Sequence, residues 1–412
     1  MSASISRRWG IVAVLHLVCA FCGTISASKG VFFPSLIQEY GLSHAAGATL
    51  LSANTAVSGA VSLLGGWLML RRVRAETFIA IVTSVVGIGF ILAGTSQSYV
   101  QLLVAYVLMA GGGITLVVTP FVLANWFDGQ RGLAIGAALA GTTSSGVVFN
   151  PLLGFVVEHW GWRAGYLGLG VAILIVAPAL TLLVVRTRPP EQQVDSGATA
   201  SGDGLTLREA LATRAYWAIL LGYIVFWAST NAYFLHFIPA VRGMGYGLEA
   251  ATLIMSALYL LAAVTKILFG WLSDRADVRF ALVSSLVAGA ASLLLLFGYL
   301  ASGSTLALQF FVPLYGLTYS APLVLFPVMV ARTFGRRQFT IIDATIMVTG
   351  SAIGSLGSIY AGWMYDVTGT YRLAFLTLGI AMAVVAALVW PLRRPIAHAG
   401  PQASQRWAPS TA

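Results

Sequence analysis

The sequence predicts an all-α membrane protein whose twelve transmembrane helices form two pseudo-symmetric bundles of six. Three observations support this prediction. The composition is 58% hydrophobic and only 9% charged, whereas an average soluble domain carries about 25% charged residues. Apolar runs follow one another along the 412 residues, each close to the roughly 20 residues that cross a bilayer as a helix. The two halves of the chain also resemble each other in sequence.

Two sets of six apolar runs flank one long polar connector. This connector, residues 187–213, is rich in Pro, Gly and Ser and predicts a loop, with a short helix near 205–213 that Thr206 caps. The predicted spans are 9–34, 46–69, 77–97, 99–126, 132–157, 164–186, 215–240, 249–273, 280–301, 306–331, 339–364 and 373–392. The predicted domains are an amino-terminal bundle (1–186), a cytoplasmic linker (187–213), a carboxy-terminal bundle (214–393) and a disordered cytoplasmic tail (394–412).

The distribution of basic residues predicts that both termini are cytoplasmic. Loops on the cytoplasmic side of a membrane carry an excess of Lys and Arg. With the amino terminus on that side, 18 of the 23 basic residues fall there, against Arg163, Arg242 and Arg372 on the other side. We expect a multi-pass protein of the inner or plasma membrane that acts as a monomer. Because the basic residues stand in small groups between apolar runs, the net charge of +10 does not indicate nucleic-acid binding.

An internal repeat supports the division into halves. Residues 52–74, SANTAVSGAVSLLGGWLMLRRVR, and residues 256–279, SALYLLAAVTKILFGWLSDRADVR, share Ser-Ala, Gly-Trp-Leu and Arg at a constant offset of 204 (256 minus 52). A second pair follows in the same order: GFVVEHWGWRAGYL from Gly154 and GWMYDVTGTYRLAFL from Gly362. Repeats between two six-helix halves are typical of secondary transporters.

The loop after the eighth predicted span carries a recognisable pattern. It reads GWLSDRADVR from Gly270 to Arg279, while its counterpart after the second span, GWLMLRRVRA, has Leu70 in place of the acid. The first of these resembles the G-x-x-x-D-R-x-x-x-R signature of the major facilitator superfamily. The resemblance covers nearly the whole chain, and it implies that Asp274 and Arg275 gate the cytoplasmic face.

A narrower resemblance lies in residues 125–166. They contain W-F-x-x-x-R-G-x-A-x-G from Trp126, with Arg131 at the basic position, followed by G-W-R from Gly161. This region is similar to the helix 4–5 region of monocarboxylate transporters and oxalate:formate antiporters. The resemblance implies a carrier of small organic anions that works by alternating access, and it places Arg131 among the gating candidates.

Two lysines fall inside predicted spans: Lys29 in GTISASKGVFF and Lys266 in LLAAVTKILFGWL. A charge at mid-bilayer costs several kcal/mol, so such residues usually face a cavity or a partner. Of the 13 acidic residues, only Asp343 lies inside a predicted span, apart from Glu249 at the very start of the eighth span. We therefore interpret the lysines as an anion site in which the substrate supplies the missing negative charge. The alternative is that both side chains reach to the membrane interfaces.

The resemblance adds a role for both lysines. In monocarboxylate transporters a basic residue, usually Arg, stands at the position of Lys266 and contacts the substrate carboxylate. A lysine also precedes V-F-F on their first helix, as Lys29 precedes Val31-Phe32-Phe33. This chain departs from the pattern at Ala262, where those transporters carry an acid, and at Lys266, because Lys lacks the bidentate fork of Arg. Proton symport and anion exchange both stay open.

Polar and aromatic side chains are expected to complete the site, although each also suits a packing role. The substrate-binding candidates are Asn54, Thr115, Asn231, Tyr233, Tyr259, Tyr315 and Tyr319. Tyr offers an apolar wall and a hydroxyl donor, which suit a small organic acid. Candidates for proton coupling or gating are His16, His236 and Asp343, the last as a gate partner for an Arg or as a proton site. Prolines in 118–125 and 318–327 are expected to kink the fourth and tenth spans.

Several functions are excluded or left open. We expect no enzyme, catalytic residue, metal or cofactor. Cys19 and Cys22 form a C-x-x-C pair on the first predicted span, which we interpret as small apolar residues of a packed helix, and no Walker loop occurs. The alternatives within transport are another anion, such as an oxalate-type dicarboxylate or an inorganic ion, and multidrug export. An exporter of cations would need acids in the cavity, where only Asp343 is available.

Overall fold

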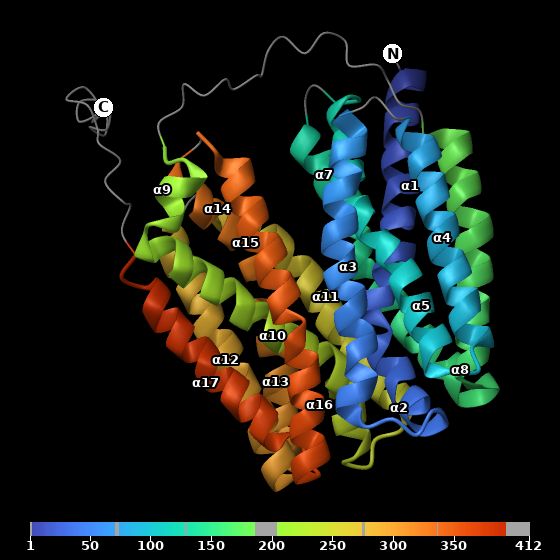
Figure 1. Ribbon diagram of the computed structural model, residues 1–412, viewed down its shortest axis with the longest axis vertical. Coiled ribbons are helices and arrows are strands. Elements are labelled where there is room, and N and C mark those ends of the chain that lie inside the picture. Colours follow the sequence, from blue (N-terminus) through green and yellow to red (C-terminus); the bar gives the residue numbers. More distant parts are fainter. Residues whose placement is uncertain are drawn as a thin grey trace.

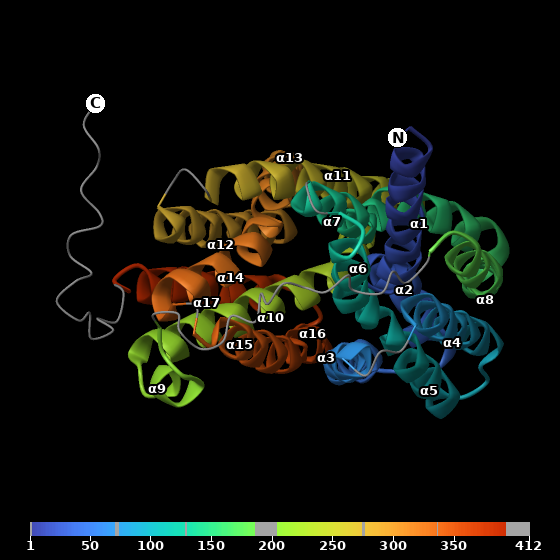
Figure 2. The same cartoon turned by 90° about the horizontal axis from the view of Figure 1, so that it is seen from above.

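A computed structural model describes residues 2–70, 74–127, 130–185, 204–273, 277–335 and 337–392. Within these ranges the chain is helical without a β-strand, and a single isolated bridge joins Gly204 to Gly335. The helices gather into two halves that stand side by side (Figures 1 and 2).

The amino-terminal half contains α1 to α8 and one 3-10 helix. Predicted spans one, four and five are each divided between two or more of these elements. The bounds are α1 (Ser2–Ala27), α2 (Lys29–Glu39), α3 (His44–Leu70), α4 (Ala75–Thr95), α5 (Tyr99–Met109), η1 (Ala110–Ile114), α6 (Thr115–Ala124), α7 (Arg131–Leu139) and α8 (Gly141–Val184).

Serine and glycine residues mark the breaks in this half. At Ser28, between α1 and α2, the hydroxyl donates a 2.6 Å bond to the Thr24 carbonyl, a local bond that competes with helix structure. The fourth span takes 3-10 geometry in the glycine-rich η1, whereas Pro120 lies inside α6. Inside α8, Gly161 has a φ of 80°, which separates the fifth and sixth spans. The first span is therefore interrupted at Ser28, which the sequence did not predict, and the break in the fourth precedes its proline.

The carboxy-terminal half contains α9 to α17. The tenth span breaks at Ser320, two residues before Pro322, as predicted, and the eleventh breaks at Ser355, which the sequence did not predict. The bounds are α9 (Leu207–Leu211), α10 (Arg214–Arg242), α11 (Leu248–Ser273), α12 (Val278–Ser302), α13 (Thr305–Tyr319), α14 (Ala321–Phe334), α15 (Phe339–Gly354), α16 (Leu356–Thr368) and α17 (Arg372–Val389).

The end of the predicted linker is attached to the carboxy-terminal half. Thr206 caps α9 in a capping box, because its hydroxyl accepts from the Glu209 N–H at 3.3 Å and its own N–H donates to Glu209 Oε2 at 2.7 Å. The bond from the Thr206 N–H is the main cause that holds the pKa of the Glu209 carboxyl below its ordinary value. The backbone N–H of Leu207 donates to Gln338 Oε1 at 2.7 Å, which fixes α9 beside the start of α15.

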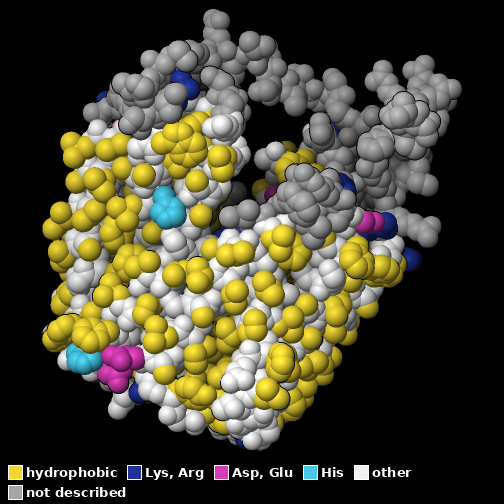
Figure 3. Space-filling model, turned by 180° about the vertical axis from the view of Figure 1, so that it is seen from behind, with side chains coloured by type: hydrophobic (Ala, Val, Ile, Leu, Met, Phe, Trp, Pro, Cys, Tyr) yellow, Lys and Arg dark blue, Asp and Glu magenta, His cyan; other side chains and the backbone are white. Residues whose placement is uncertain are grey.

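The exterior of the molecule suits a membrane. Ten of the described segments are long and apolar enough to cross one, and one of them, Gly132–Val184, contains two predicted spans that meet at Gly161. On the face shown in Figure 3, apolar side chains cover the surface between the two ends. Together with the helical content and the division into halves, this confirms the predicted fold class.

The two halves contact each other along part of their length only. α2 packs on α10, α3 on α16 and α8 on α11. We call the end that holds the start of α3 and the end of α16 the closed end. Toward the opposite end, where α1 begins, the halves separate (Figures 1 and 3), and we call it the open end.

Candidate functional site

Lys29 is the first residue of α2 and lies between the two halves. Only 7% of it is exposed, and its Nζ donates a 3.0 Å hydrogen bond to Oδ1 of Asn231 on α10. The amide of Asn231 donates in turn to the carbonyl of Trp227 at 2.9 Å, which orients the oxygen that Lys29 contacts. The Lys29 side chain therefore reaches across to the other half, and not to a membrane interface.

A close approach of helices buries this lysine. At Gly30, a Cβ would lie 2.8 Å from the Phe234 carbonyl, so α2 and α10 touch through their backbones. Only glycine permits such an approach without a shift of one helix. The break at Ser28 starts α2 at the level of this contact, and it thereby places Lys29 beside Asn231.

Lys266 bridges the halves at a second place. Its Nζ donates to the hydroxyl of Thr143 on α8, and the lysine is partly exposed. Tyr259 lies seven residues, or about two turns, before Lys266 and therefore on the same face of α11. Its ring packs on Gly146 of α8, so this face of α11 is the one that contacts α8. Ser256 Oγ donates to the carbonyl of the next residue of α8, Val147, at 2.6 Å.

Four predicted tyrosines, Tyr233, Tyr259, Tyr315 and Tyr319, lie in α10, α11 and α13, and ring contacts connect them. The rings of Tyr233 and Tyr315 are 4.4 Å apart between centroids, and those of Tyr315 and Tyr319 are 6.2 Å apart. Phe234 connects the cluster to the interface, since its ring lies 5.1 Å from Tyr259 and 4.8 Å from Tyr319. The hydroxyl of Tyr233 has no hydrogen-bond partner among the described residues. The structure thus forms one aromatic wall from residues predicted separately.

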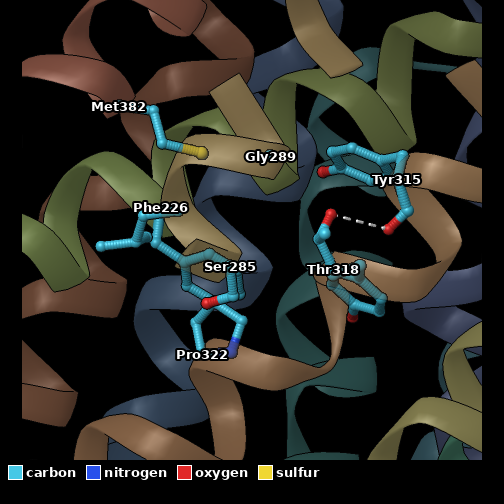
Figure 4. Close-up of a pocket in the computed structure, with 9 residues that line it drawn as sticks. Phe226, Ser285, Gly289, Tyr315, Thr318, Pro322 and Met382 are labelled. Atoms are coloured by element: carbon cyan, nitrogen blue, oxygen red, sulfur yellow. Dashed lines mark hydrogen bonds between the residues drawn. The ribbon is translucent and has the colours of Figure 1, made fainter. Parts of the chain in front are cut away.

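A small pocket adjoins this wall inside the carboxy-terminal half (Figure 4). Tyr315 and Tyr319 both line it, and Thr318, between them in sequence, donates from its hydroxyl to the Tyr315 carbonyl at 3.3 Å. The remaining lining residues are Phe226, Ser285, Leu286, Gly289, Pro322 and Met382.

Two predicted substrate contacts are engaged inside the amino-terminal half. Asn54 donates from its amide to the Tyr106 carbonyl at 2.7 Å, which joins α3 to α5. Thr115 donates to the carbonyl of Gly112 at 2.8 Å, within the end of η1. Both are buried, and these bonds stay within the amino-terminal half.

The histidines named as possible proton carriers have structural contacts. His16 Nδ1 lies 2.8 Å from the Ala137 carbonyl and Nε2 lies 3.0 Å from Ser144 Oγ, so both ring nitrogens tie α1 to the junction of α7 and α8. His236 is fully buried, and its Nε2 lies 2.8 Å from the Ser358 carbonyl, which joins α10 to α16.

The predicted gating residues lie toward the open end or outside the described part. Asp343 is on α15 and is partly exposed. Asp274 and Arg275 lie outside the described residues, and so does the side chain of Arg131. Sequence reasoning missed Thr143, whose only signal was its place in the polar stretch GTTSSG opposite a lysine-bearing helix.

Comparison with known proteins agrees with this architecture. The family model of the Major Facilitator Superfamily matches residues 12–264 and 248–411. Human monocarboxylate transporter 11 is 24% identical over 412 residues, which covers 95% of this chain and 84% of the relative. Zebrafish (Danio rerio) monocarboxylate transporter 12-B is also 24% identical, and the match covers 91% of this chain and 84% of the relative.

Solved structures share the fold. A bacterial homologue of the human lysosomal transporter Spinster, in an inward-facing and occupied conformation, superposes with a TM-score of 0.76 at 16% identity and covers 92% of this chain and 95% of that one. A D-xylose–proton symporter superposes with a TM-score of 0.71 at 13% identity and covers 94% and 98%. The chain is therefore a membrane transporter and not an enzyme, and it belongs to the major facilitator superfamily.

Proposed function

We propose that this transporter moves small organic monocarboxylate anions by alternating access. One observation carries the proposal: both intramembrane lysines sit between the halves, and their hydrogen-bond partners among the described residues are neutral. Lys29 contacts an amide oxygen and Lys266 contacts a hydroxyl. A neutral partner satisfies one donor but leaves the positive charge without a counter-ion, so a carboxylate at this interface gains a charge-assisted bond.

The aromatic wall supports an organic substrate. Tyr259 and Tyr319 lie on either side of Phe234, which sits three residues from Asn231 in α10. This arrangement offers apolar ring surface on α10, which carries Asn231, and on α11, which carries Lys266, and a small acid needs such a surface for its apolar body as well as a cation for its carboxylate. The curated relatives named as monocarboxylate transporters point to the same class of cargo.

Orientation and location belong to this proposal. With both termini in the cytoplasm, as the basic residues favour, the open end faces the cytoplasm and the structure is the inward-facing state. Lys266 is then accessible from the cytoplasm, and Lys29 lies deeper, where α2 packs on α10. The membrane is the inner or plasma membrane of the cell, and the monomer is the functional unit.

The mode of transport is proton symport or anion exchange. Ala262 lies one turn before Lys266 on α11 and is buried, so the acid that monocarboxylate transporters carry there is missing. Exchange of one anion for another requires no proton carrier, whereas symport requires a titrating group elsewhere, with Asp343 of α15 as the remaining candidate.

Uptake by proteoliposomes tests the proposal. The purified full chain is reconstituted and offered a panel of labelled monocarboxylates, dicarboxylates and inorganic anions, with and without a pH gradient and with and without unlabelled anion inside. We expect monocarboxylate uptake above that of protein-free vesicles. Stimulation by an acidic exterior indicates symport, and stimulation by internal anion indicates exchange. Uptake restricted to dicarboxylates, inorganic anions or organic cations would contradict the proposal.

A further inference from the structure

Asp366 of α16 makes a contact across the halves at the closed end. Its Oδ1 accepts from the backbone N–H of His44 at 2.8 Å, and its Oδ2 accepts from the N–H of Ala45 at 2.9 Å. The His44 ring adds a contact of 3.0 Å between Nδ1 and Oδ1. His44 and Ala45 are the first residues of α3, so one carboxylate of the carboxy-terminal half holds the start of a helix of the other half.

These bonds complete the cap of α3. The first N–H groups of a helix have no acceptor within the helix, and a negative charge is favourable there. Ser43, directly before the helix, supplies one acceptor, because its hydroxyl accepts from the Ala46 N–H at 3.1 Å. The N–H groups of His44 and Ala45 instead have Asp366 as their acceptor. When the halves part at this end, these two N–H groups lose that acceptor.

Close packing of α16 on α3 surrounds the Asp366 contact. At Gly362, one turn before, a Cβ would lie 2.6 Å from the His44 carbonyl oxygen, so α16 rests on the backbone of α3. The ring of Tyr365 lies 4.0 Å from the His44 ring. Deeper in the interface, Ser52 of α3 donates to the Ser355 carbonyl at 2.8 Å.

A second acid at the closed end provides a contrast. Glu39 pairs with Arg163 at 2.9 Å, and both side chains are partly exposed. Glu39 ends α2 and Arg163 lies in α8, so this ion pair joins two helices of the same half. It does not have to break when the halves move apart, whereas the Asp366 contact does.

We propose that Asp366 is a positioning residue of the transport cycle, a latch that holds the closed end shut by capping α3 from the opposite half. The latch releases whenever the halves separate at that end, and water then replaces the carboxylate on His44 and Ala45. Its strength biases the molecule toward the state that the structure shows. The inference does not depend on the identity of the cargo.

Accessibility of a single thiol tests the latch. Cys19 and Cys22, both buried, are replaced by Ala, and Ser52→Cys introduces a thiol at a buried position of the interface. The rate of labelling by a hydrophilic maleimide is measured on the full chain in detergent micelles, where both ends meet the reagent. Labelling then reports the fraction of time for which the closed end is open, without any assumption about membrane sidedness.

The expected result is a clear increase on loss of the carboxylate. Asp366→Asn should raise the labelling rate roughly tenfold, because bonds to an ionised acceptor are lost. Gly362→Ala should raise it as well, since the added methyl forces α16 away from α3 while the charge stays. His44→Gln should raise it less, because both backbone N–H donors remain.

Glu39→Gln is the matched control, with the same loss of charge at the same end, and it should leave the rate within about twofold. Labelling that is unchanged in both Asp366→Asn and Gly362→Ala would overturn the proposal. So would an equal increase in Glu39→Gln, because that outcome would indicate general loosening. If Asp366→Asn fails to fold by size-exclusion chromatography, the result of Gly362→Ala against Glu39→Gln decides.

Discussion

The two lysines at the interface sit in different surroundings. Lys29 is buried at the start of α2, where Gly30 brings two backbones into contact, and it bonds to a fixed amide. Lys266 is partly exposed on α11 and bonds to a hydroxyl. The same type of charge is therefore enclosed at one place and accessible at the other. In the function that we propose, an anion that enters from the open end meets Lys266 first and reaches Lys29 only as contacts between the halves rearrange.

Removal of the accessible lysine should have the largest effect. We predict that Lys266→Ala abolishes carboxylate uptake, with a loss of roughly 10- to 100-fold or more, because a charge-assisted bond contributes about 1.5–3 kcal/mol. Uptake into proteoliposomes gives the loss, and membrane insertion is checked in the same preparation. Lys266→Arg is the matched control, since it keeps the charge and should retain uptake. Wild-type uptake by Lys266→Ala would remove this residue from the mechanism.

Removal of the enclosed lysine should have a smaller effect of a different kind. Lys29→Gln keeps a hydrogen-bond donor for Asn231 but removes the charge, so we expect apparent affinity to fall about tenfold and maximal rate to change less. Concentration-dependent uptake separates KM from the maximal rate. Unaltered kinetics would indicate that Lys29 only joins α2 to α10.

The aromatic wall should contribute least among the substrate contacts. Tyr319→Phe keeps the ring and removes the hydroxyl, and we expect less than about a threefold change in KM for any monocarboxylate, because the ring surface contributes more to binding than the hydroxyl does. Tyr319→Ala should raise KM more for acids with a larger apolar body. Equal losses across the panel with Tyr319→Ala would assign the residue to packing alone.

His16 offers a prediction outside the site. Because both ring nitrogens hold α1 to the α7–α8 junction, His16→Gln should lower thermal stability by a few °C, as expected for about 1 kcal/mol. The pH profile of uptake should not shift. A shifted profile with unchanged melting temperature would make His16 a proton carrier after all.

Much of the fold could be predicted because the bilayer acts locally on the sequence. Each span needs its own apolar run, so the runs, the boundary between the fifth and sixth spans near Gly161 and the repeat between halves are visible without tertiary information. The breaks at Ser28 and Ser355 were not predicted. Serine is compatible with both a continuous and an interrupted helix, so its presence does not predict a break. Packing against the neighbouring helix selects one of the two, as the contact between Gly30 and the Phe234 carbonyl does for α2.

The charged residues of the site could be predicted from the sequence, but the residues that they contact were harder to predict. Lys29 and Lys266 stand out because a cation in an apolar run is costly, and the tyrosines stand out by their chemistry. Thr143 and Asp366 do not, since each meets its partner across more than 100 residues of sequence. Asn54 and Thr115 looked equally suitable, but their bonds are to nearby backbone within one half. Composition alone cannot tell which face of a helix a polar residue occupies.

The central claim is that the positive charge of the interface lysines has no counter-ion among the residues that the structure describes and that the transported anion supplies one. Asn231→Asp tests it most directly, because this substitution builds a carboxylate at the oxygen that Lys29 already contacts at 3.0 Å. Uptake of a labelled monocarboxylate is measured in proteoliposomes, with Asn231→Gln as the neutral control. The account predicts that Asn231→Asp loses uptake at least about tenfold relative to Asn231→Gln. Equal or faster uptake with the built-in carboxylate would contradict it.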